Sequence, residues 1–183
     1  MFGEVGSTGD LTIDLDDTTI TTSGKSAFGV LGGYTDGSTG GLHTTYEGIG
    51  TLTIDINRGS ITTEGSASFG AVGRHPGTGD INITLTDTSV STTGATITVD
   101  TDSDYNIPSI GVHSHHYGGG ETDISLTNTT VSTMGDRAYG VYSLLYDPAG
   151  DIISTNETDI SLTNTSVSTM GDGAHGVYSR VIE

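Results

Sequence analysis

The sequence predicts an all-β fold, a right-handed parallel β-helix (β-solenoid) of about five coils that carries loop and hairpin insertions. Three observations lead to this prediction. A motif recurs five times, its copies contain short stretches of alternating apolar and polar residues, and no apolar 3.6-residue period of useful length is present. A chain of 183 residues is long enough for one domain, and we expect a single β-helix segment over residues 1–183.

The repeat is clearest in two segments of the C-terminal half. Residues 121–143 read ETDISLTNTTVSTMGDRAYGVYS, and residues 157–179 differ from them at only three of 23 positions. Weaker copies begin at residues 11, 52 and 81. The connections between copies vary in length while the motif persists, which indicates that the motif is the structural unit. The three differences are Thr130 against Ser166, Arg137 against Gly173 and Tyr139 against His175.

Each copy contains three short strands separated by corners. The first strand alternates aliphatic and polar residues, as Leu11, Ile13 and Leu15 do, so its aliphatic side chains share one face. The second strand ends on a glycine that we interpret as a turn with positive φ. The third strand contains Gly-Val or Gly-Ala. The recurring turn glycines are Gly24, Gly65, Gly94, Gly135 and Gly171.

One copy cannot bury its own faces, so the copies are expected to stack with equivalent strands ~4.8 Å apart. An antiparallel sandwich is the competing architecture, but it does not explain why five copies keep the same internal order. Stacking aligns equivalent threonines in one ladder, which comprises Thr22, Thr63, Thr92, Thr133 and Thr169.

Three insertions interrupt the regular pattern, at residues 31–50, 95–108 and 144–156. Insertions in repeat proteins map to loops, often on the functional face. Residues 96–99 of the middle insertion, Thr-Ile-Thr-Val, are compatible with an extra hairpin strand. We expect the specificity of the protein to lie in these insertions or along exposed polar ladders.

The charge of the chain excludes some classes of partner. Lys and Arg total 5 against 23 Asp and Glu, which gives a net charge of −18. Nucleic-acid binding needs clustered basic residues, and binding to anionic membrane surfaces needs them too. Because the few basic residues of this chain are scattered, we expect neither a nucleic acid nor an anionic membrane as partner. No apolar run reaches the ~20 residues of a membrane helix, and the first residues do not read as a signal peptide.

Asp100, Asp102 and Asp104 form an alternating carboxylate run within the middle insertion. The spacing matches the first three ligands of a calcium loop, but an EF-hand needs Gly at the sixth position and Glu at the twelfth, where this chain has Tyr105 and Gly111. An EF-hand is therefore excluded. Two interpretations stay open, a looser Ca²⁺ site and a solvated acidic loop.

His113, His115 and His116 form a second candidate metal cluster. In a strand His113 and His115 share a face, so they could bind Zn²⁺ or Ni²⁺ with a third ligand from a neighbouring coil. Chance clustering near a loop is the alternative. No other cofactor is indicated.

Catalysis has little support in the sequence. Glycoside hydrolysis needs paired carboxylates at a defined separation, and a carboxylate–base pair is disfavoured by the small number of basic residues. No serine-nucleophile motif occurs. We therefore expect that the protein is not an enzyme.

The unit I-x-L-x-[ND]-[TG]-[TS]-[IV]-[ST]-T-x-G, followed by A-x-G-V-Y, resembles the passenger-domain repeats of pertactin-like Gram-negative autotransporters. Residues 159–179, DISLTNTSVSTMGDGAHGVYS, show it best. The resemblance implies export, anchoring of the full-length protein by a C-terminal β-barrel, and display on the outer surface of a Gram-negative bacterium. The chain would then be a fragment of a longer passenger domain, consistent with its strand-like last residues.

The resemblance also implies a function. We expect a non-catalytic cell-surface stalk or adhesin module that binds a host surface or matrix protein or glycan, or that self-associates between cells. A carbohydrate-active or carbohydrate-binding β-helix is the first alternative. An ice-binding β-solenoid is the second, because regular Thr ladders can order water, although here Asp, Arg, Glu and Met share that surface.

Overall fold

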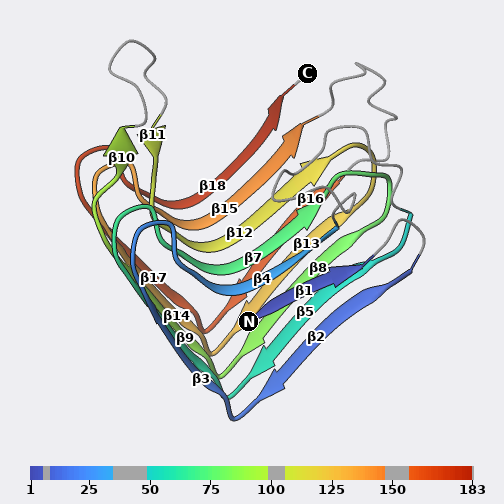
Figure 1. Ribbon diagram of the computed structural model, residues 1–183, viewed down its shortest axis with the longest axis horizontal. Helices are drawn as coiled ribbons and strands as arrows, with labels where there is room; N and C mark the ends of the chain where they lie inside the picture. Colours follow the sequence, from blue (N-terminus) through green and yellow to red (C-terminus); the bar gives the residue numbers. More distant parts are fainter. Residues whose placement is uncertain (6–8, 35–48, 99–105, 147–156, 183) are drawn as a thin grey trace.

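The computed structural model describes residues 1–5, 9–34, 49–98, 106–146 and 157–182, and all its regular elements are β-strands (Figure 1). These strands form a parallel β-helix of about five coils, as the repeat predicts. No helix long and apolar enough to cross a membrane occurs in these residue ranges.

Each coil contains three strands, joined by two corners. The first coil consists of β2 (Leu11–Asp16), β3 (Thr19–Ser23) and β4 (Phe28–Tyr34), and β1 (Phe2–Val5) precedes it. The other coils repeat this order. They comprise β5 (Leu52–Asn57), β6 (Ser60–Glu64) and β7 (Phe69–His75); β8 (Ile81–Thr86), β9 (Ser89–Thr93) and β12 (Ile110–Tyr117); β13 (Thr122–Thr127), β14 (Thr130–Met134) and β15 (Tyr139–Tyr146); and β16 (Thr158–Thr163), β17 (Ser166–Met170) and β18 (His175–Ile182).

Stacking of the coils produces three parallel sheets. Sheet A has the order β1-β4-β7-β12-β15-β18, sheet B the order β16-β13-β8-β5-β2, and sheet C the order β17-β14-β9-β6-β3. Sheets B and C meet in a V, and sheet A curves across its open side (Figure 1). The molecule is therefore a three-sided prism whose sides are the three sheets.

The interior of the prism holds the aliphatic residues of the alternating strands. Leu52, Ile54 and Ile56 on β5 are at most 1% exposed, and the equivalent residues of β8 and β13 pack in register above them. Burial of one such side chain contributes about 1.5–3 kcal/mol. The period of two read from the sequence thus identifies the core correctly.

The predicted threonine ladder is confirmed by the register of sheet C. Thr22 pairs with Thr63, Thr63 with Thr92, Thr92 with Thr133, and Thr133 with Thr169. Its side chains face the interior, because Thr63, Thr92 and Thr133 are fully buried. This ladder is therefore part of the core and offers no face to water or ice.

The turn glycines after sheet C confirm the predicted positive φ at four of five positions. Gly24, Gly65, Gly135 and Gly171 have φ values of 115–135°. For Gly94 the prediction is wrong, since its φ is not positive. A Cβ at Gly94 would collide with the backbone carbonyl of Gly65 in the preceding coil, so close stacking of the turns requires glycine there.

The corner between sheets B and C uses left-handed residues at equivalent positions of successive coils. Four of the five are Asp or Asn, the non-glycine residues that adopt this conformation most readily. The exception is Arg58, whose guanidinium donates hydrogen bonds to Asp16 and Asp17 of the first coil. These corner residues are Asp17, Arg58, Asp87, Asn128 and Asn164.

The middle insertion contains a hairpin, as its sequence suggests. Strand β10 (Ile97–Thr98) pairs antiparallel with β11 (Asn106–Ile107), between β9 and β12 of the third coil. Most of the insertions at residues 31–50 and 144–156 lies outside the described residues.

Candidate functional site

The three sides of the prism present different outward chemistry. Sheet B exposes acidic residues, for example Asp14, Asp55 and Asp123. Sheet C exposes Ser and Thr in two columns, of which Thr130 and Ser132 are members. The outer face of sheet A carries aromatic rings, histidines and arginines in place of both.

Strand register produces the aromatic ladder of sheet A. One outward column contains Phe28, Phe69, Ile110, Tyr139 and His175. A second column, three residues further along each strand, contains Leu31, Val72, His113, Tyr142 and Tyr178. Because parallel strands lie 4.7–4.9 Å apart, rings in one column lie within stacking distance of each other.

The rings of the ladder stack closely. The Phe28 and Phe69 centroids lie 4.8 Å apart with planes 10° from parallel. His113 stacks on Tyr142 at 5.0 Å, and Tyr142 stacks on Tyr139 of the other column at 4.7 Å. The two columns thus form one continuous aromatic surface in the C-terminal coils.

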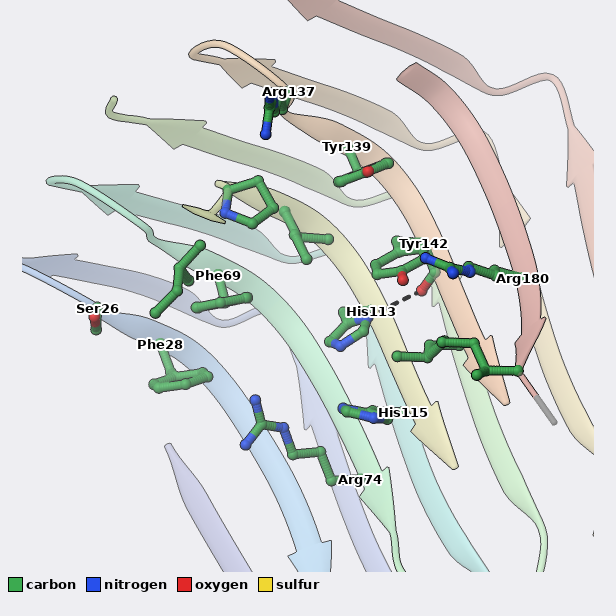
Figure 2. A pocket seen from close by; sticks show the side chains of 15 residues that line it. Ser26, Phe28, Phe69, Arg74, His113, His115, Arg137, Tyr139, Tyr142 and Arg180 are labelled. Atoms are coloured by element: carbon green, nitrogen blue, oxygen red, sulfur yellow. Dashed lines mark hydrogen bonds between the residues drawn. The ribbon is translucent and has the colours of Figure 1, made fainter. Parts of the chain in front are cut away.

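A groove of about 610 Å³ follows this surface from the first coil to the fifth (Figure 2). Most of its walls come from outward side chains of sheet A, and Ile107 of the hairpin strand β11 and Pro108 after it also line the groove. Its described lining consists of Ser26, Phe28, Phe69, Arg74, Ile107, Pro108, Ile110, His113, His115, Arg137, Tyr139, Tyr142, Leu144, Arg180 and Ile182.

The charge of the groove is opposite to that of the chain. Arg74, Arg137 and Arg180 line it, which are three of the four arginines in the sequence. The fourth, Arg58, is bound to Asp16 and Asp17 on a distant corner. None of the 23 Asp and Glu residues belongs to the described lining. The described lining therefore carries positive but no negative side chains, in a protein of net charge −18.

The arginines lie beside aromatic rings. The Arg74 guanidinium carbon is 5.9 Å from the Phe28 ring centroid, a distance at which a cation is attracted to the ring face. The Arg180 side chain extends toward Tyr142 (Figure 2). A guanidinium group keeps its hydrogen-bond donors in one plane, so it can attract a ring and bind an acidic group at the same time.

The two groove histidines are neutral at physiological pH. Burial, together with the nearby Arg74 guanidinium, lowers the pKa of His113 to about 3. Burial and the neighbouring His113 lower the pKa of His115 to about 2. The positive charge of the groove therefore comes from arginine alone and does not change across the physiological range.

His113 has a defined orientation in the groove. Its Nδ1 lies 3.2 Å from the Tyr142 carbonyl oxygen, which can only accept, so Nδ1–H is the donor (Figure 2). In the neutral ring Nε2 is then an acceptor. Burial raises the pKa of Tyr139 and that of Tyr142, so the hydroxyls of both lining tyrosines stay protonated.

The predicted histidine metal cluster is divided between two faces of β12. His113 and His115 do share the outer face, with ring centroids 5.5 Å apart. His116 faces the interior, where its Nε2–H donates to the Gly77 carbonyl oxygen at 3.0 Å. No group of three potential metal ligands occurs among the described residues. The possible calcium ligands Asp100, Asp102 and Asp104 lie outside the described residues.

The groove lies largely outside the insertions and polar ladders in which the sequence pattern predicts specificity. Ile107, Pro108 and Leu144 are the lining residues that belong to those insertions. Most of its lining belongs to the third strand of each repeat, which the sequence pattern suggested was scaffold. A sequence signal was nevertheless present. The two near-identical copies differ at three positions, and two of these, 137 and 139, contribute Arg137 and Tyr139 to the groove.

The lining has the chemistry of a binding site. It offers flat aromatic faces, neutral hydrogen-bonding groups and cationic guanidinium groups. Two facing carboxylates, which most glycosidases use, are not among its described residues. A scan against protein-family models, a search of curated proteins and a search of solved structures each found no match to this chain.

Proposed function

We propose that this β-helix is a non-catalytic adhesion module that binds glycans through the groove on sheet A. The observation that carries the proposal is the gathering of stacked aromatic rings and three of four arginines on one side of the prism. Tyr and Arg are, with Trp, the residues most enriched at the energetic centres of protein interfaces. The other two sides present Asp, Ser and Thr, which are well solvated.

A glycan matches this lining better than an apolar ligand does. One face of a pyranose ring carries C–H groups that pack on aromatic rings, while its edge carries hydroxyls that need hydrogen-bond partners. Tyr139 and Tyr142 supply partly exposed ring faces and protonated hydroxyls. The groove extends across the stacked strands, so it accommodates an extended chain of sugars.

Surface display is the second part of the proposal. The repeat of this chain resembles that of autotransporter passengers, whose β-helices project from the cell. A long prism with one binding side would present its groove to host or matrix glycans, and the acidic and Ser/Thr sides would keep the rod soluble.

Binding of the 183-residue chain to an array of neutral and acidic oligosaccharides tests this function. We expect at least one glycan to bind, and Tyr142→Ala to weaken that binding by about 10-fold or more, because a central tyrosine contributes about 2 kcal/mol. Ser132→Ala on sheet C is the matched control and should bind as the parent does.

A melting curve for each variant separates loss of binding from loss of folding. Tyr139→Ala, at a second partly exposed ring, gives a further measurement if Tyr142→Ala is unstable. The proposal would be wrong if no oligosaccharide binds. It would also be wrong if folded groove variants bind as tightly as the parent.

A further inference from the structure

We infer that the ligand is an anionic oligosaccharide, whose acidic groups pair with the arginines while its sugar rings cover the aromatic ladder. This inference rests on the proposed glycan-binding function and specifies its ligand. The groove combines two features that a neutral glycan does not require together: three guanidinium groups, and a described lining without Asp or Glu.

The spacing of the arginines indicates the length of the ligand. Arg74 lies in register with His115, His115 with Leu144, and Leu144 with Arg180. Arg74 and Arg180 are therefore in one column, three interstrand spacings or about 14 Å apart. An extended sugar unit is about as long as one interstrand spacing, so a chain of roughly four units connects the two arginines.

The surface between the two arginines is neutral and ring-bearing. Neutral His115 and Leu144 separate them in the column, and the stacked His113–Tyr142 pair lies beside it. An acidic group at each end and sugar rings between them would fit this order. Guanidinium suits such acidic groups because its planar donors pair with two oxygens of a carboxylate or sulfate at once.

A nucleic acid fits this surface less well than an anionic glycan does. A phosphate backbone carries one charge per nucleotide, and its binding depends on many cationic contacts. The groove has three arginines, and the remaining sides of the prism would repel a long polyanion. A short glycan can remain on sheet A, away from the Asp residues of sheet B. Salt screens the electrostatic field of those residues beyond about 8 Å.

The fourth and fifth coils show that the charged positions vary while the scaffold stays constant. Leu144 of β15 stands in register with Arg180 of β18, and Arg137 is replaced by Gly173 in the following repeat. Both arginines line the groove. The charges are therefore placed individually and are not a by-product of the repeated motif.

The test is calorimetric titration of the full chain with tetragalacturonate and with its fully methyl-esterified form. The two probes share the sugar backbone and differ in charge. We expect the acid to bind and the ester to bind at least about 10-fold more weakly, as loss of charged hydrogen bonds requires. Arg180→Gln should weaken binding of the acid about 10-fold or more and leave binding of the ester unchanged.

Arg58→Gln is the matched control, because it removes the same charge from the corner between sheets B and C. It should not change the affinity. Arg74→Gln provides a second groove variant, with its melting temperature measured alongside. A tetrasaccharide of chondroitin sulfate is a further probe. Because chondroitin also carries carboxylates, its unsulfated tetrasaccharide is titrated beside it. Tighter binding of the sulfated form than of the unsulfated form would support an anionic ligand and identify sulfate as the preferred acidic group.

The remaining outcomes overturn one or both proposals. Equal binding of the acid and the ester would overturn the anionic ligand while the glycan-binding function stands. Absence of binding by every oligosaccharide would overturn the glycan-binding function and the inference with it. Equally tight binding of poly-glutamate or single-stranded DNA would show that charge is recognised without sugar.

Discussion

Thr63, Thr92 and Thr133 are fully buried, and their hydroxyls have no hydrogen-bond partner among the described residues. The methyl groups of Thr63 and Thr133 lie beside Gly29 and Gly111 of sheet A. Threonine therefore acts here as a core residue of the size of valine. A buried hydroxyl without a partner has a desolvation cost of about 1–3 kcal/mol.

Thr92→Val should stabilise the protein, by about 1 kcal/mol, because it replaces an unpaired hydroxyl with a methyl group of the same shape. Urea denaturation at pH 7 measures the change. Thr130→Val, at an exposed position in sheet C, is the control and should have a smaller effect. A loss of stability in Thr92→Val would show that its hydroxyl has a partner.

Two histidines buried in the interior add to the pH dependence of stability that His113 and His115, with their lowered pKa values, also produce. His75 and His116 are fully buried and lie 5.2 Å apart. In His75, Nε2–H donates to the Gly50 carbonyl and Nδ1 accepts from the Gly77 amide, so the neutral ring is fully paired. Protonation of Nδ1 would break the second bond. Burial lowers the pKa of His75, and it lowers that of His116 to about 4.

We therefore expect stability to fall as the pH decreases from about 6.5 toward 4. In this window the unfolded histidines bind protons and the folded ones do not, so each contributes a slope of at most about 1.4 kcal/mol per pH unit. Urea melts of the parent and of His116→Gln should show a shallower dependence in the variant. Equal slopes in the parent and in His116→Gln would contradict the account.

At the scale of the strands, the glycines of sheet A set its distance from sheet C. A Cβ at Gly111 would meet the Val131 side chain and lie 2.6 Å from the Gly140 carbonyl oxygen. Gly70 and Gly140 have equivalent surroundings on β7 and β15. The recurring Gly-Val pair of the repeat therefore combines a close backbone approach with a buried aliphatic residue.

Gly111→Ala should destabilise the protein by about 1–3 kcal/mol, because the surrounding core must move to admit a methyl group. Gly33→Ala is the matched control on β4, since its nearest neighbour would be 3.6 Å from the new Cβ. Thermal melts compare the two variants. A smaller loss in Gly111→Ala than in Gly33→Ala would contradict the close packing of the sheets.

The strands and their stacking could be predicted from the sequence, but most of the groove could not. Alternation within five copies identifies the inward residues of β2, β5, β8, β13 and β16, because burial dictates them directly. The groove depends on register. Phe69 and Tyr142 are far apart in sequence, and they come to one face because both of their strands pair with β12. Comparison of the repeats shows these outward positions only as variable ones. It does not show that the outward residues of each sheet have their own chemistry.

As a whole, the molecule separates scaffold from recognition. Its interior is nearly the same in every coil, so the prism can persist while outward residues change. The three sides of the surface differ in chemistry: sheet B presents carboxylates, sheet C presents hydroxyls, and sheet A presents arginines with aromatic rings. The account therefore predicts that one side binds and that the other two do not.

Amide chemical-shift mapping of the isotope-labelled chain with the tightest-binding oligosaccharide of the array tests this claim most directly. The account predicts that the perturbed amides cluster on β7, β12, β15 and β18, with the largest changes around His113 and Tyr142. Perturbations centred on the strands of sheet B or sheet C, with those of sheet A unchanged, would contradict it.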